Sequence, residues 1–162
     1  MKQLNTIYAG KDEIIMKIAI ASDHAGWQVK ERVKKYLVTL KHSIKDFGTD
    51  SENPVDYPDF GVAVARAVAS GKFRCGILIC GSGLGMCIVA NKVKGIRAVN
   101  CYDKTTAELS RRHNDANILC IGARLLDMKQ IKGIIKVWLN TSFEGGRHQR
   151  RVDKISRLDR NI

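Results

Sequence analysis

The sequence predicts one α/β domain, built on a doubly wound sheet of five parallel strands with helices on both faces. Short apolar runs alternate five times with longer segments in which apolar residues recur every three or four positions. This alternation is typical of strand–helix–strand units and of a parallel sheet that is covered on both sides. A chain of 162 residues is also long enough to bury one substantial core.

The first half of the domain contains two expected strands and two expected helices. Residues 16–22 form an apolar run, and residues 26–41 follow as an amphipathic helix with its apolar residues on one face. Residues 43–47 predict a short second strand. A polar loop over residues 48–58 contains both prolines, and a second helix is expected at residues 59–70.

Residues 1–15 show no clear periodicity and precede a second methionine, Met16, at which the first regular strand begins. We interpret them as an N-terminal extension outside the fold, with disorder as one expectation. The remainder, residues 16–162, is then a single domain that includes the C-terminal helix.

The most informative segment runs from a buried strand, expected at residues 77–80, into a glycine-rich turn. The strand ends in the thiol of Cys80, and Ser82 adds a hydroxyl. Alternating glycines allow positive φ and close approach of a ligand, and amides at the start of the next helix attract negative charge. These glycines are Gly81, Gly83 and Gly85. The same pattern also fits a core cysteine followed by a simple turn, and the segment alone does not decide between the two.

The second half of the chain continues the alternation. Strands are expected at residues 95–101 and 116–121, and helices at residues 103–113 and 125–139. A last helix with an apolar stripe opens near Gly145. Because ligands of open parallel sheets bind beyond the carboxyl ends of the strands, the residues that follow each strand are the candidates for chemistry.

Two further groups could serve such a site. Asp23 and His24 directly follow the first strand, although a helix N-cap and a surface imidazole would give the same pattern. Arg147 and Arg151 are four residues apart and would share one face at the start of the last helix, which suits a phosphate. A solvated basic face would look the same.

The net charge of +12 raises the question of a nucleic-acid partner. The excess is spread along the chain, with 15 basic and 9 acidic side chains in residues 1–100 and 13 and 7 in residues 101–162. No basic run or aromatic-rich basic stripe stands out. We therefore expect a solvated basic surface, a few arginines for a small anionic ligand, and no nucleic acid.

The cysteines and the apolar stretches indicate the cellular setting. Five cysteines are an odd number without a Cys-x-x-Cys pair, which argues against a disulfide framework and against a zinc site. No apolar stretch is long enough to cross a membrane, and no signal peptide is recognisable. The sequence predicts a cytoplasmic protein with no membrane partner.

Several uses of the glycine-rich turn fail on spacing. A dinucleotide fingerprint needs a third glycine where Met86 stands, and a Walker loop needs a Gly-Lys-Ser/Thr ending. A cysteine phosphatase needs an arginine at the position of Met86. The remaining combination is a thiol beside backbone amides, with His, Asp and Arg residues at other strand ends. It suits proton transfer next to a carbonyl group in a phosphorylated compound.

Six motifs occur in order between Met16 and about Asp159. They are Ser22-Asp-His-Ala-Gly26, Asp56-Tyr-Pro58, Cys80-Gly-Ser-Gly-Leu-Gly85, Ala90-Asn-Lys92 with Gly95-Ile-Arg-Ala98, Ser110-Arg-Arg-His-Asn114, and Gly145-Gly-Arg-His-Gln149. Together they resemble type B ribose-5-phosphate isomerase. The resemblance implies a Rossmann-like subunit, a sugar phosphate substrate, and neither metal nor organic cofactor. It also implies a homodimer or a dimer of dimers, with active sites shared between subunits.

The resemblance implies catalytic roles for four residues. Cys80 resembles the base that moves a proton between C1 and C2 of the substrate, and Ser82 the hydroxyl that helps proton transfer at the oxygens. His113, with Asp23, resembles the pair that opens the furanose ring. Some family members use a glutamate base in the loop, but that position is Met86 here, so the chain resembles the cysteine subgroup.

The resemblance also implies a substrate-binding set. Asn114 and the loop amides would hold the enediolate, Tyr57 would line the pocket, and a histidine with three arginines would bind the phosphate. The full set is Asp23, His24, Tyr57, Gly81, Ser82, Gly83, Leu84, Gly85, Asn114, Arg124, Arg147 and Arg151.

Other functions remain as alternatives. Galactose-6-phosphate isomerase has two subunit types with this fold, but here Cys80, His113, Asn114 and both tail arginines occur in one chain, which favours a pentose phosphate enzyme. Allose 6-phosphate is a candidate secondary substrate. A more distant alternative is a nucleotide- or nucleic-acid-binding module without catalysis, which steeply salt-dependent binding of DNA or RNA would support.

Overall fold

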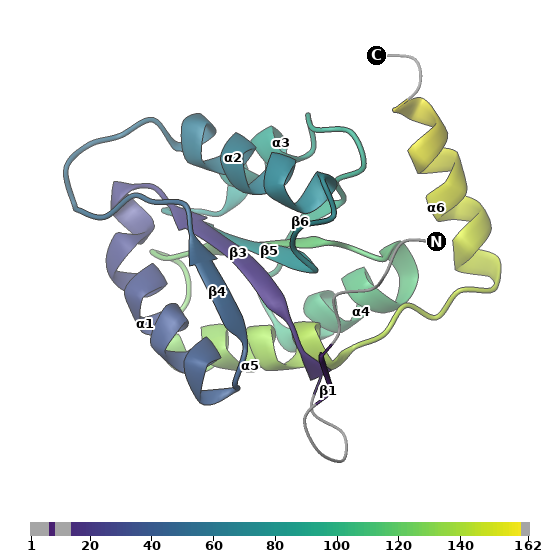
Figure 1. The fold of residues 1–162 in the computed structure, drawn as a ribbon, viewed down its shortest axis with the longest axis horizontal. Coiled ribbons are helices and arrows are strands. Elements are labelled where there is room, and N and C mark those ends of the chain that lie inside the picture. Colours follow the sequence, from purple (N-terminus) through teal and green to yellow (C-terminus); the bar gives the residue numbers. More distant parts are fainter. Residues whose placement is uncertain (1–6, 9–13, 160–162) are drawn as a thin grey trace.

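A five-stranded sheet lies at the centre of the molecule, between two layers of helices (Figure 1). The computed structural model describes residues 7–8 and 14–159. All neighbouring strands of this sheet are parallel. Their order is β4 (Ser43–Asp46), β3 (Lys17–Ser22), β5 (Cys75–Cys80), β7 (Ile118–Gly122) and β6 (Ala98–Asn100). The predicted α/β class and the doubly wound, Rossmann-like sheet of five parallel strands are confirmed.

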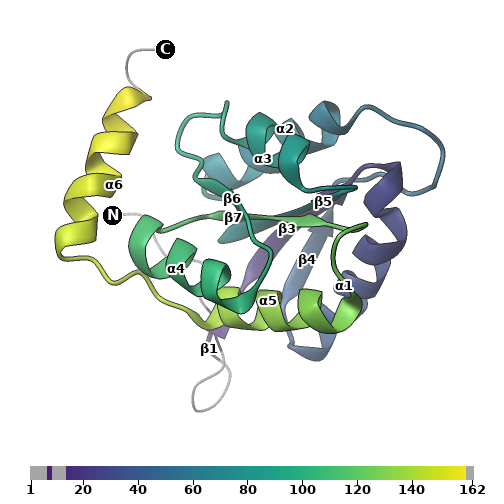
Figure 2. The ribbon, with the colours of Figure 1, turned by 180° about the vertical axis from the view of Figure 1, so that it is seen from behind.

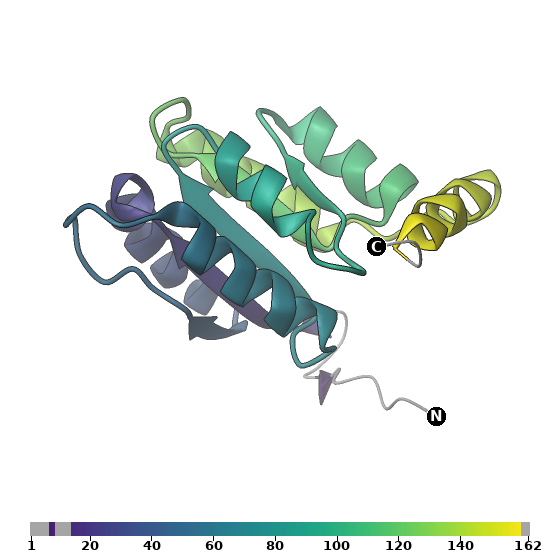
Figure 3. The same ribbon diagram turned by 90° about the horizontal axis from the view of Figure 1, so that it is seen from above.

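Helices cover both faces of the sheet (Figures 1 and 3). One face is covered by α1 (Trp27–Thr39), α4 (Lys104–Asn114) and α5 (Met128–Asn140). The other face is covered by α2 (Tyr57–Ala69) and α3 (Leu84–Ala90). The short 3-10 helix η1 (His24–Gly26) precedes α1. The last helix, α6 (Arg147–Leu158), lies at one side of the molecule, next to α4 (Figure 2).

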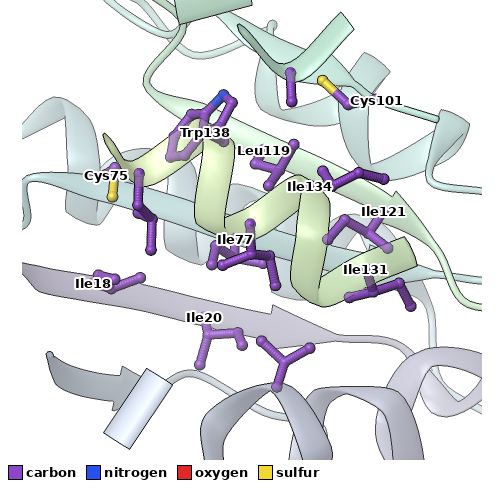
Figure 4. Packing of buried hydrophobic residues seen from close by; sticks show 14 of the residues in the cluster. Ile18, Ile20, Cys75, Ile77, Cys101, Leu119, Ile121, Ile131, Ile134 and Trp138 are labelled. Carbon is purple, nitrogen blue, oxygen red and sulfur yellow. The ribbon is translucent and has the colours of Figure 1, made fainter. Parts of the chain in front are cut away.

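The core follows from the alternation of side chains along the strands. β3 presents Ile18 and Ile20 to the layer of α1 and α5, where they are fully buried (Figure 4). Burial of each such isoleucine contributes on the order of 1.5–3 kcal/mol. On the other face the buried residues of β3 are Ala19 and Ala21, and a Cβ added to Gly76 of β5 would lie 2.7 Å from Val64 of α2. Small residues on this face therefore let α2 approach the sheet closely.

Some element boundaries differ from the prediction. α2 begins at Tyr57 rather than at residue 59, and Pro58 stands in its first turn, where a backbone N–H would have no helical partner. α5 begins at Met128 rather than at residue 125, because Asp127 and Gln130 exchange the hydrogen bonds of a capping box. β6 has three residues instead of the seven expected at residues 95–101.

The N-terminal segment contains a short antiparallel ladder between β1 (Ile7–Tyr8) and β2 (Ile14–Ile15), separate from the main sheet. The sequence predicted no element there, and the rest of residues 1–13 lies outside the described part of the chain. Within the described residues, none of the helices is both long and apolar enough to span a bilayer.

Candidate active site

An open cleft of about 400 Å³ lies beyond the carboxyl ends of β3 and β5. The chain leaves β3 toward β4 on one side and reaches β5 on the other, so this is the point where the sheet changes winding direction and where open α/β sheets bind ligands. The lining residues are Asp23, His24, Ala25, Tyr57, Cys80, Gly81, Ser82, Gly85, Arg124 and Leu125. All of them except Ala25 and Leu125 belong to the catalytic and substrate-binding residues predicted from the sequence.

The thiol of Cys80 stands at the last position of β5 and is almost buried, with 4% of the residue exposed. The backbone N–H of Gly83 donates to Sγ of Cys80 at 3.1 Å. Gly83 has φ +80°, and a Cβ at this position would lie 2.5 Å from Oδ1 of Asn100. Glycine is therefore required for the backbone to turn over the thiol.

A side chain from a neighbouring strand supports the glycine loop. Nδ2 of Asn100, at the end of β6, donates to the carbonyl of Ser82 at 3.1 Å. On the other side, the ring of Tyr57 lies so close to Gly85 that a Cβ there would be 2.7 Å from it. The loop is thus held between β6 and the first turn of α2. Asn100 was absent from the predicted set, because a lone amide in a short strand matches no motif.

Asp23 and His24 enter the cleft from the end of β3. The carboxylate of Asp23 accepts a hydrogen bond from the N–H of Gly26 at 2.9 Å, so it also caps η1 as the alternative interpretation proposed. Nδ1 of His24 accepts from the N–H of Val55 at 3.2 Å. In the neutral imidazole this bond assigns the proton to Nε2, which leaves Nε2 as a donor for an anion.

Arg124 completes this group from the loop after β7. Its backbone N–H donates to the carbonyl of Gly81 at 3.0 Å, which joins this loop to the glycine loop. The guanidinium is exposed, and among the described residues it forms no ion pair with a carboxylate. Lining the cleft beside Gly81, it is a positive charge that is available to an anionic ligand.

The remaining predicted residues lie elsewhere in the chain. His113 and Asn114 end α4, and they precede β7 at its amino end, whereas Cys80 stands at the carboxyl end of β5. The amino ends and the carboxyl ends of these strands are separated by roughly 15–20 Å, because the strands have five or six residues. Arg147 and Arg151 lie on α6, across the molecule from the end of β3 that leads into α1 (Figure 1). One chain therefore does not bring the full set together.

This second group is organised around two imidazoles. The rings of His113 and His148 stack with centroids 4.1 Å apart and an interplanar angle of 4°. Nε2 of His113 lies 3.7 Å from a carboxylate oxygen of Glu144. Burial lowers the pKa of His148, and the nearby His113 and Arg147 charges lower it further. Protonation of His148 is therefore disfavoured.

The same residues are the one set in the described part of the chain with three potential metal-binding atoms within 4.8 Å, namely those of His113, Glu144 and His148. Because the two rings are parallel, their in-plane lone pairs run side by side rather than toward one point. This arrangement suits proton exchange better than a tetrahedral metal centre.

Comparison with known proteins gives a consistent assignment. Residues 18–155 match the ribose/galactose isomerase family. The chain is 45% identical over 143 residues to ribose-5-phosphate isomerase B of Escherichia coli, a match that spans 88% of this chain and 96% of that one. It is 42% identical over 143 residues to D-erythrulose-4-phosphate isomerase of Pectobacterium atrosepticum, spanning 87% and 93%.

Solved structures show the same fold. Ribose-5-phosphate isomerase B of Clostridium thermocellum is similar with a TM-score of 0.89 and 47% identity, over 90% of this chain and 99% of that one. The enzyme of Mycoplasma genitalium, solved with bound ribulose 5-phosphate, is similar with a TM-score of 0.85 and 40% identity, over 90% and 97%.

Proposed function

The chain belongs to the ribose/galactose isomerase family and is a sugar-phosphate isomerase, and we propose that it interconverts D-ribose 5-phosphate and D-ribulose 5-phosphate. The observation that carries this proposal is the thiol of Cys80 in a cleft, 3.1 Å from the N–H of Gly83. A base beside preorganised amides is what an aldose–ketose isomerisation requires.

In the proposed reaction Cys80 acts as the base on the open-chain sugar. The thiolate takes the proton from C2, and the electron pair of the C–H bond forms the C1–C2 double bond of an enediolate. The same thiol then returns the proton to C1, while Ser82 moves a proton between O1 and O2. The N–H of Gly83 donates to Sγ, and the N–H of Leu84 donates to Oγ of Ser82, so we assign the other amides of the loop to the developing oxyanion.

The proposed site requires a second copy of the chain. His24 and Arg124 supply phosphate ligands from one subunit, and Arg147 and Arg151 supply the others from α6 of the partner. His113 of the partner opens the ring together with the Asp23 carboxylate. This sharing is supported by the distance within one chain between the cleft residues and the residues on α4 and α6. Residues at opposite ends of the strands cannot meet on one small substrate.

Exposed apolar side chains support an association of subunits. Leu84 and Ile88 of α3 are 52% and 62% exposed, and Leu158 of α6 is 65% exposed. They flank the glycine loop and the arginine helix, the two parts that the proposed site combines. We propose a homodimer as the smallest active unit, with a dimer of dimers also compatible.

The test is conversion of ribose 5-phosphate to ribulose 5-phosphate by the purified protein, with a chelator present. Galactose 6-phosphate, allose 6-phosphate and D-erythrulose 4-phosphate are run in parallel. They are needed because two relatives with similar sequence identity to this chain are named for different sugar phosphates. Turnover of the pentose phosphate with the highest kcat/KM supports the proposal. Preference for a hexose or a tetrose phosphate would assign the chain to another substrate of the same family.

A further inference from the structure

A second thiol lies close to the glycine loop and has no role in the proposed function. Cys87 stands on α3 and is half-buried. Its Sγ accepts from Nδ2 of Asn91 at 3.6 Å and donates to the carbonyl of Ala98 at 3.4 Å. The N–H of Asn100 and the thiol of Cys120 also form hydrogen bonds with it. The sulfur therefore lies among three donors and one acceptor.

These contacts distinguish Cys87 from the other cysteines. The hydrogen bond from Cys120 lowers the pKa of the Cys87 thiol to about 7, against the opposing effect of burial. Burial instead raises the pKa of Cys75 to about 12 and that of Cys101 to about 11. At neutral pH a large fraction of Cys87 is thus a thiolate, the form that reacts with oxidants, and it is partly exposed to solvent.

The neighbouring thiol of Cys120 supplies the second half of a redox pair. Cys120 is fully buried in the middle of β7, on the face that α3 covers. Burial raises its pKa well above the ordinary value, and the hydrogen bond to Cys87 adds to the effect. It therefore stays protonated and unreactive toward solvent oxidants, and Cys87 packs against the buried cluster to which Cys120 belongs.

We propose that Cys87 and Cys120 form an oxidant-sensitive thiol pair, in which a peroxide oxidises Cys87 and Cys120 then closes a disulfide. The Cys87 thiolate attacks one peroxide oxygen, the O–O bond breaks, and Cys87 becomes a sulfenic acid. The sulfur of Cys120 then attacks that sulfur, the S–O bond breaks, and water leaves with the thiol proton. Two electrons pass from the two thiols to the peroxide, which becomes an alcohol or water and a second water.

The pair is mechanically connected to the loop that holds Cys80. The backbone N–H of Cys87 donates to the carbonyl of Gly83 at 3.1 Å, and Gly83 is the residue whose N–H contacts the Cys80 thiol. A disulfide that draws α3 toward β7 moves this carbonyl. Slower isomerisation of the oxidised protein is the expected consequence, and this last step rests on the proposed function.

The experiment is peroxide treatment of the 162-residue chain, followed by intact mass measurement and peptide mapping, so that its outcome does not depend on activity. We expect a mass lower by two hydrogens that dithiothreitol reverses, and a link between residues 75–92 and 113–124 that fragmentation assigns to Cys87 and Cys120. The Cys80→Ser variant should form the same link. The Cys75→Ala variant removes a buried thiol on the opposite face of the sheet, and it should also form the link between Cys87 and Cys120.

Two variants remove the pair. Cys87→Ser and Cys120→Ser should lose the link, and Cys87→Ser tests the proposal even if Cys120→Ser fails to fold, because Cys87 is only half-buried. Iodoacetamide at pH 7 should label Cys87 at least about 10-fold faster than Cys75 or Cys101. A wild-type protein that gains oxygen without a disulfide, or a disulfide that persists in Cys87→Ser, would overturn the proposal.

Discussion

Replacing Gly83 by alanine tests whether the shape of the glycine loop is required for turnover. The φ of +80° costs an L-residue roughly 1–2 kcal/mol. The added Cβ would lie 2.5 Å from Oδ1 of Asn100, so it displaces the amide that donates to the carbonyl of Ser82. Loss of that hydrogen bond costs about 1 kcal/mol more. We expect the free energy of unfolding to fall by about 2–3 kcal/mol.

The effect on catalysis should be larger. The N–H that donates to Sγ of Cys80 belongs to Gly83 itself, and it moves with the backbone when Asn100 is displaced. Loss of one preorganised donor typically lowers kcat by roughly 10²–10³-fold, and we expect the lower end of that range. Urea unfolding and steady-state kinetics with ribose 5-phosphate measure the two quantities.

Gly95→Ala is a matched control that separates backbone strain from the steric clash with Asn100. Gly95 has φ +82°, and no heavy atom lies within 4 Å of a Cβ added there. Gly95→Ala should therefore lose about 1–2 kcal/mol of stability and keep the wild-type kcat. If Gly83→Ala turns over at the wild-type rate, or if both variants lose kcat equally, the loop does not position the reacting groups as described.

The remaining predictions concern the shared site and the fold. Arg147→Ala should raise KM about 10-fold or more with little change in kcat, because a charge-assisted contact to phosphate is lost; an unchanged KM would contradict the assignment. Mixtures of inactive Cys80→Ser and His113→Ala proteins should regain about a quarter of wild-type activity after subunit exchange, since one site of each mixed dimer is intact; no recovery would argue against shared sites. Burial alone would raise the pKa of Asp46, but hydrogen bonds, above all from Lys30, lower it below 3.8. The stability from this carboxylate is therefore present above about pH 4 and is lost as the pH falls through the lowered folded-state pKa. Asp46→Asn should remove this acid dependence in denaturation experiments and cost about 3–5 kcal/mol, because the fully buried Lys30 loses the carboxylate 2.7 Å from its Nζ and, among the described residues, keeps only that of Glu31, at 3.9 Å; a smaller loss would mean that Glu31 replaces Asp46 as its partner.

The sequence predicted the fold and the cleft well for a physical reason. Buried parallel strands are continuous apolar runs, and the residues directly after such runs meet at one edge of the sheet. Asp23 and Cys80 were found in this way, and the structure brings both to the cleft. Tyr57 was expected in a loop because Pro58 follows it, yet a proline in the first turn begins a helix as readily as it interrupts one.

Other features depend on spatial relations that the order of residues does not reveal. Asn100 supports the loop only because that loop passes beside β6. The pairing of His113 with His148 joins the end of α4 to the start of α6, and no local pattern indicates it. The pairing of Cys87 with Cys120 likewise joins a helix to a strand that lies beneath it in space.

The central claim, that Cys80 carries a proton between C1 and C2 of ribose 5-phosphate, is tested most directly by NMR of the reaction in D₂O. A thiol exchanges its proton with solvent, so the wild-type protein should form ribulose 5-phosphate that carries deuterium at C1. The Cys80→Ser variant should be folded and form neither the ketose nor the label. A Cys80→Ser protein that produces labelled ketose at the wild-type rate would contradict the account.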